Sequence, residues 1–240
     1  MYFWKCWRDT RGSFFIFLGA LLAAGAYGAY VKFDPVGWIA AKPLESRLLW
    51  QSLATALLDT TVLTVPLAGG LFLGALGVGF EFEKGTAGFL LTRPRTRRYF
   101  LWTSWGLGAA QIVVLVLVGC LFRLAGLGLR PVKGPGDFFR ILVAFCTLAL
   151  FCYTVTYLMT TLARNSRNGT ALAIAVFVGY EGLWAWLRFW HGINIPFFGD
   201  LFKRAIHPAA DFSFTPVAGW LTVCLALMLV AQFRLDLAEV

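Results

Sequence analysis

The chain has 240 residues, of which 59% are hydrophobic and 14% are charged, and its mean hydropathy is +0.73. This composition excludes an ordinary soluble domain and predicts an all-α integral membrane protein, because several charge-free stretches reach the roughly 20 residues needed to cross a bilayer. The net charge of +9 does not indicate nucleic-acid binding, since most of the 21 Lys and Arg residues lie between the apolar stretches, at headgroup positions.

Residues 1–12 are predicted to form an amphipathic elbow helix that lies in the membrane interface. On a helical wheel the aromatic residues fall on one side and the charged residues on the other: Phe3, Trp4, Trp7 and Phe14 against Lys5, Arg8 and Asp9. Arg11 falls on the aromatic side, so a second interpretation, a membrane span flanked by basic anchors, stays open. No cleavage pattern follows, and we expect the segment to be retained.

The first three spans are expected at residues 13–31, 53–80 and 99–122. Trp38 and Trp50, in the loop between the first two, suit an interfacial belt. Pro66 and the Gly69-Gly70 pair are expected to kink the second span. Asp59 lies about 20 residues before Phe80, which places it near the opposite membrane surface and not in a buried functional site.

The later spans are expected at residues 141–163, from 169 onward, and from 212 or 216 to 233. Glu181, followed by Arg188, is expected to interrupt the fifth span and either to line a substrate path or to anchor a re-entrant segment over residues 190–215. The five cysteines form no CxxC pair and are interpreted as apolar fillers. We therefore expect a single transmembrane domain over residues 1–240, with six spans and both termini on one side.

Charge counting orients this topology only weakly. Eleven Lys and Arg residues fall in the termini and in the loops assigned to the cytoplasm, and ten fall in the opposite loops. The first group is denser, and four arginines crowd into residues 93–98. Cytoplasmic termini in a bacterial inner membrane are the expectation.

The most informative stretch is the connector between the second and third spans, residues 81–100, EFEKGTAGFLLTRPRTRRYF. Glu81 and Glu83 stand at a membrane boundary, where an ionised carboxylate must reach water or a cation. Lys84-Gly85 can end the second helix and Thr86 can cap a new short helix, which the Arg93-Pro94 step ends. The connector is thus expected to place a short helix across the cytoplasmic end of a helical hairpin.

The order E-x-E-x-G-T, apolar residues, then P-x-x-R resembles the signature of type-two ATP-binding-cassette (ABC) exporter permeases. In that family the connector is a coupling helix that docks in a cleft of the ATP-binding subunit. The resemblance carries this role to eight positions: Glu81, Glu83, Gly85, Thr86, Phe89, Leu90, Pro94 and Arg97. It extends more weakly to the whole chain, through the elbow, the six spans and the re-entrant region. An ordinary cytoplasmic loop would explain the arginines, but not the paired glutamates and the Gly-Thr step.

The resemblance implies a permease that exports its substrate with two copies of an ATP-binding subunit and a second permease copy or homologue. The chain has no GxxxxGK[ST] phosphate loop, so ATP and Mg are expected on the partner subunit. No cofactor, metal or catalytic site is expected in this chain. The second and fifth spans, the expected dimer interface, offer aromatic residues, Gly and Thr, which favours an amphipathic or lipid-like cargo.

Two other functions compete with transport. The chain could be a non-transporting subunit or scaffold of a larger membrane complex. It could also be a membrane-embedded hydrolase that uses polar residues of the segment after the fifth span: His191, Asp200, His207 and Asp211. The sequence contains neither HExxH nor GxSxG, which disfavours the hydrolase.

Overall fold

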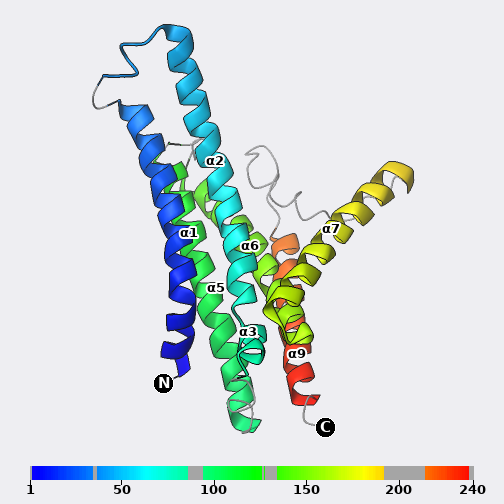
Figure 1. Ribbon diagram of the computed structural model, residues 1–240. Coiled ribbons are helices and arrows are strands. Elements are labelled where there is room, and N and C mark those ends of the chain that lie inside the picture. The colour runs from blue at the N-terminus through cyan, green and yellow to red at the C-terminus, as the bar shows by residue number, and fades with distance from the viewer. Residues whose placement is uncertain are drawn as a thin grey trace.

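The structure is a computed structural model that describes residues 2–34, 37–85, 94–125, 127, 134–191 and 214–237. Over these ranges the chain is all-helical, as the sequence predicts (Figure 1). The helices, in chain order, are α1 (Tyr2–Phe33), α2 (Leu44–Ala75), α3 (Val78–Glu83), α5 (Pro94–Leu124), α6 (Pro135–Ala163), α7 (Ser166–His191) and α9 (Thr215–Leu237).

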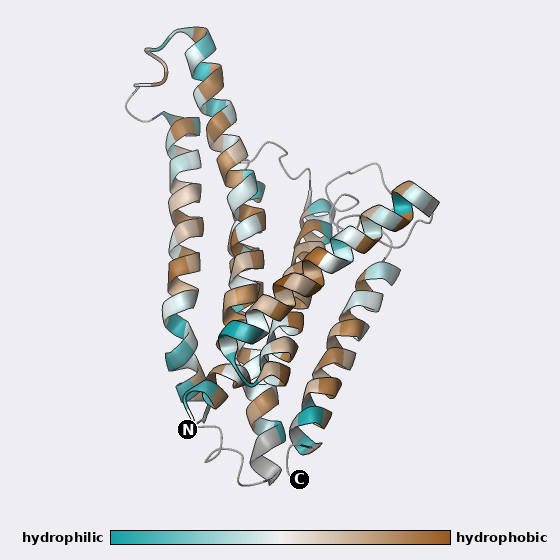
Figure 2. Ribbon diagram, turned by 45° about the vertical axis from the view of Figure 1, so that its right-hand side comes forward, coloured by the Kyte–Doolittle hydropathy of each residue, from teal (hydrophilic) through white to brown (hydrophobic). Residues whose placement is uncertain are grey.

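Within the described ranges, six stretches of helix are long and apolar enough to cross a membrane, and α2 and α3 together supply the second of them. Hydrophilic residues gather toward the two ends of the bundle, with a largely hydrophobic band between them (Figure 2). Helix α1 begins and α9 ends at the same end of the bundle, as an even number of spans requires.

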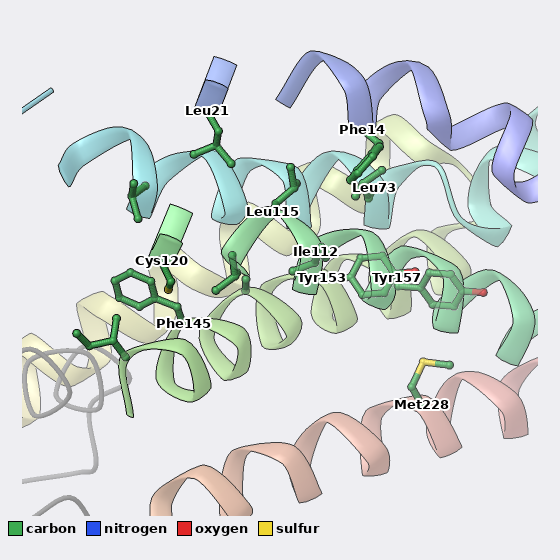
Figure 3. Packing of buried hydrophobic residues seen from close by; sticks show 14 of the residues in the cluster. Phe14, Leu21, Leu73, Ile112, Leu115, Cys120, Phe145, Tyr153, Tyr157 and Met228 are labelled. Atoms are coloured by element: carbon green, nitrogen blue, oxygen red, sulfur yellow. The ribbon is translucent and has the colours of Figure 1, made fainter. Parts of the chain in front are cut away.

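Helix α6 lies at the centre and packs against α2, α3, α5, α7 and α9. Its buried Tyr153 and Tyr157 sit among apolar side chains from four other helices, including Phe14, Leu73, Ile112 and Met228 (Figure 3). Both phenol groups remain hydrogen-bonded: Tyr153 donates to the Trp105 carbonyl at 3.1 Å and Tyr157 to the Leu101 carbonyl at 3.1 Å. Pairing of this kind is required where no water reaches a polar group.

Glycines allow α2 and α6 to approach closely. A Cβ at Gly70 would lie 3.0 Å from the Ala149 carbonyl oxygen, and one at Gly74 would lie 2.8 Å from Thr156 Cβ. Small residues at a membrane helix interface bring two backbones together and increase their dispersion contacts. The Gly69-Gly70 pair therefore belongs to a packing surface, and α2 continues through it and through Pro66; the kink expected at these residues stays a prediction.

The separate elbow helix expected over residues 1–12 is not confirmed, since α1 is one helix from Tyr2 to Phe33. The face that α1 buries continues into these residues: Cys6 and Thr10 are buried like Phe14 and Leu21. Thr10 accepts a hydrogen bond of 2.9 Å from Gln111 Nε2 in α5. This continuous packing surface explains why the helix does not break at Gly12.

Two other expectations about helix limits were wrong. The second span begins at Leu44 and not near residue 53, and the interruption of the fifth span does not occur, since α7 runs through Glu181 to His191. Glutamate is itself a good helix former, so a single charged side chain does not end the helix. Residues 192–213, most of the expected re-entrant segment, lie outside the described residues.

Candidate functional site

The end of the bundle at which the connector starts carries the candidate site, and we call it the connector end. It contains the first turns of α1, helix α3, the start of α5, the α6–α7 turn and the end of α9 (Figure 1). Polar contacts join segments here that are far apart in the sequence. We call the opposite end, where α1 turns into α2, the hairpin end.

Helix α3 is a short continuation of the second span, offset from α2 by a break at residues 76–77. It lies against α6 so closely that a Cβ at Gly79 would be 2.6 Å from the Thr160 carbonyl oxygen. Gly85, just beyond α3, has a φ of +70°, a left-handed conformation that ends the helix at low cost only for glycine. The backbone at the start of the connector is therefore positioned by the packing of Gly79 against α6 and by the turn at Gly85.

Glu81 is buried at the connector end and forms an ion pair with Lys5 of α1. Its carboxylate accepts a hydrogen bond of 2.6 Å from Lys5 Nζ, and the two side chains are 9% and 30% exposed. The sequence indicated that this glutamate needs water or a cation. The structure supplies the cation from a residue 76 positions away, which no local pattern could identify.

The side chain of Glu83, the last residue of α3, contacts the N-terminus of α7. Its Oε2 accepts a hydrogen bond of 3.3 Å from the Ser166 backbone N–H, at the helix N-terminus, where a negative charge is favourable. The Ser166 hydroxyl in turn donates to the Ala75 carbonyl at 2.9 Å, and the Arg164 guanidinium lies 5.8 Å from the Phe82 ring centroid. The α6–α7 turn thus contacts the connector through Glu83 and Phe82, and the end of α2 through Ala75.

The other side of the connector joins α9. Arg98, near the start of α5, pairs with Asp236 at 3.2 Å, and the Trp102 indole N–H donates to Gln232 Oε1 at 3.0 Å. Both ends of the connector are therefore tied to further helices, Glu81 to α1 and Arg98 to α9. The sequence alone did not predict these partners, because it shows which charged residues lie at the ends of spans but not which of them pair.

The structure describes only part of the predicted coupling segment. Glu81, Glu83 and Gly85 come together within and beside α3. Pro94 and Arg97 belong to the first turn of α5, and their side chains lie outside the described part of the chain. Three more predicted residues, Thr86, Phe89 and Leu90, also lie outside it.

The other predicted site residues are not brought together. Glu181 and Arg188 are both exposed on α7, and within the described ranges no ion pair joins them; the Arg188 guanidinium lies instead over the Trp184 ring, 5.0 Å from its centroid. The side chain of His191 is not described, and three residues of the hydrolase interpretation, Asp200, His207 and Asp211, lie outside the described residues.

Reversing the charge of Lys5 tests the ion pair with Glu81. Lys5→Glu should lower the free energy of unfolding by about 1–3 kcal/mol, because a largely buried carboxylate loses a charged donor and gains a like charge. The double variant Lys5→Glu/Glu81→Lys should recover most of this loss. Thermal unfolding in detergent measures both, with Arg8→Glu, an exposed change on the same helix, as the control. If the double variant is no more stable than Lys5→Glu, the pair contributes nothing.

In the described part of the chain, these contacts hold the start of the connector between α1, α6, α7 and α9. A family model described as ABC-2 family transporter protein matches residues 3–188, a range that includes the whole connector. No curated protein and no solved structure gives a significant match.

Proposed function

The chain belongs to the ABC-2 family of transporter proteins and is a multi-pass membrane transporter subunit, and from this premise we propose that it is the permease of an ATP-driven exporter whose connector docks on a separate ATP-binding subunit. The observation that carries the proposal is the anchoring of α3. Glu81 pairs with Lys5 and Glu83 accepts from Ser166, so the connector starts from a packed and charge-paired base.

A coupling element works only if its contacts differ in free energy between the two states of the transporter. A base joined rigidly to several helices suits this task, because a displacement of the docked segment then moves those helices with it. The connector meets this requirement on both sides, through α1 and the α6–α7 turn at one end and through α9 at the other. ATP and Mg bind on the partner subunit in this proposal, because the chain lacks a phosphate loop.

The working assembly contains two ATP-binding subunits and a second permease, identical or homologous, in a bacterial inner membrane with the connector end in the cytoplasm. The exposed faces of α2 and α7 are the expected permease interface. Trp186, Phe189 and Trp190 are exposed on α7, which diverges from the rest of the bundle (Figure 1). Aromatic and aliphatic surface without a dense polar site favours an amphipathic or lipid-like cargo.

Co-purification tests the partner. A tagged full-length chain, extracted from its native membrane in mild detergent, should bring down a protein that carries a phosphate loop and hydrolyses ATP. Phe89→Ala and Glu83→Ala should each reduce transport in liposomes at least tenfold and should remove its coupling to ATP hydrolysis. Phe139→Ala, an exposed aromatic residue on α6 near the hairpin end, is the matched control and should retain both activities.

Two results would contradict this function. The first is a purified chain without any associated ATPase, which would favour a free-standing enzyme or scaffold. The second is normal substrate-stimulated ATPase and transport in the Phe89 and Glu83 variants, which would leave the connector without a coupling role.

A further inference from the structure

A cavity of about 260 Å³ lies between α1 and α2 at the hairpin end, away from the connector. Gly28 and Lys32 of α1 line it on one side and Gln51, Ala54 and Thr55 of α2 on the other, and Leu127 also contributes to its lining. Gly28 gives it room: a Cβ at this position would meet only Leu58 and Leu127, at 3.7 and 4.0 Å.

The depth of the cavity follows from helix geometry. Lys5 pairs with Glu81 at the connector end, and Lys32 lies on the same helix as Lys5. At about 1.5 Å per residue the two lysines are about 40 Å apart along the axis of α1. A bilayer with its headgroups is about 40–45 Å thick. If the Lys5–Glu81 pair lies in the headgroup layer at the connector end, Lys32 therefore lies in the headgroup layer at the hairpin end. Trp38 and Trp50, whose rings pack at 5.7 Å near the same end, suit this layer.

The lining of the cavity is amphipathic along this axis. Lys32 and Gln51 are the lining residues nearest the helix ends, whereas Gly28, Ala54 and Thr55 lie about one turn deeper in the bundle. Lys32 Nζ donates to the Ala125 carbonyl at 3.3 Å, a contact that holds its ammonium group toward the α5 end of the cavity. An ammonium and an amide above an apolar floor match an anion that is bonded to an apolar body.

Two carboxylates of this part of the chain, Asp34 and Asp59, have partners of their own. The two oxygens of Asp34 accept from the backbone N–H groups of Ile39 and Ala40, at 3.0 and 2.6 Å. Asp59, one turn below Thr55, pairs with Arg123 at 3.0 Å. The charge that faces the cavity from its own lining is therefore positive.

We propose that this cavity binds the phosphate of an anionic phospholipid from the leaflet at the hairpin end. Lys32 and Gln51 contact the phosphate, and the glycerol and first methylenes lie over Gly28, Ala54 and Leu127. The site is independent of the proposed ATPase docking, which concerns the other end of the bundle.

Native mass spectrometry of the delipidated full-length protein, titrated with phosphatidylglycerol or phosphatidylcholine, tests the site. Wild type should retain one phosphatidylglycerol molecule with an affinity at least fivefold above that for phosphatidylcholine. Lys32→Gln should weaken phosphatidylglycerol binding about fivefold, the order expected from one lysine near an anionic surface. Lys42→Gln is the matched control, because Lys42 lies over the Trp38 ring and does not line the cavity, and it should bind as wild type does.

Gly28→Leu is a second variant, which keeps Lys32 and fills the cavity, and it should also lose the bound lipid. Equal retention of the two lipids by wild type overturns the proposal, and this comparison needs no variant to fold. An equal loss in Lys32→Gln and Lys42→Gln also overturns it, because the attraction would then be a general surface effect. Inorganic phosphate that displaces phosphatidylglycerol at equal concentration overturns the assignment to a lipid.

Discussion

Replacing Asp59 by leucine should lower the free energy of unfolding by about 3–5 kcal/mol, because the change leaves the Arg123 guanidinium buried without its carboxylate. The two side chains are 19% and 6% exposed, and Arg123 Nη2 lies 3.0 Å from Asp59 Oδ1. The guanidinium also lies 5.4 Å from the centroid of the Phe145 ring, so α2 and α6 both contact this α5 side chain. Thermal unfolding in detergent measures the loss.

The double variant Asp59→Leu/Arg123→Leu separates the cost of an unpaired charge from a net contribution of the pair. It should be close to wild type in stability or above it, since an apolar pair avoids the desolvation of two ions. Asp137→Leu is the control, because Asp137 is 3.9 Å from the half-exposed Arg140. A loss in Asp59→Leu no larger than in Asp137→Leu would show that Arg123 finds water or another partner.

Replacing Gly79 by valine should separate α3 from α6. The new Cβ would lie 2.6 Å from the Thr160 carbonyl oxygen and 2.8 Å from Thr160 Cβ, and a carbonyl in the central helix cannot move aside as a flexible side chain can. We expect a loss of at least about 3 kcal/mol, the upper part of the range for overpacked sites, together with loss of the Glu83–Ser166 contact. Unfolding temperature and transport activity should fall together.

Gly219→Val is the matched control for this change. Gly219 lies on α9, and a Cβ there would meet nothing within 4 Å. Both variants add the same side chain to a helix, so the difference between them isolates the contact with Thr160. Equal stability of the two would mean that α3 is held only loosely and could not serve as a base for the connector.

The number of spans could be predicted from the sequence because a bilayer imposes a length of about 20 apolar residues on each crossing helix. The limits of the helices could not, because a helix that leaves the membrane needs no change of composition to continue. Helix α2 therefore begins at Leu44, and α1 contains the residues expected to form an elbow. A single charged residue is a poor breaker as well, and α7 continues through Glu181.

The candidate site was predictable in its residues but not in its partners. The sequence marks Glu81 and Glu83 as carboxylates at a membrane boundary, and Asp59 as an acid near the opposite surface. Which cation meets each of them depends on helix packing between residues far apart in the chain. Lys5 and Arg123 thus emerge only from the structure. Arg123 directly follows an apolar stretch and Lys5 precedes one, and an antiparallel neighbour presents the opposite charge at the same depth.

The contact between Glu83 and Ser166 places the connector at the base of a long lever. Helix α7 has 26 residues, about 39 Å of axis, and diverges from the other helices over its second half (Figure 1). A tilt of about 5° at Ser166 would displace the His191 end by about 3 Å, a distance comparable to the width of a side chain. Movements too small to break any hydrogen bond at the connector end would therefore be magnified at the opposite membrane surface.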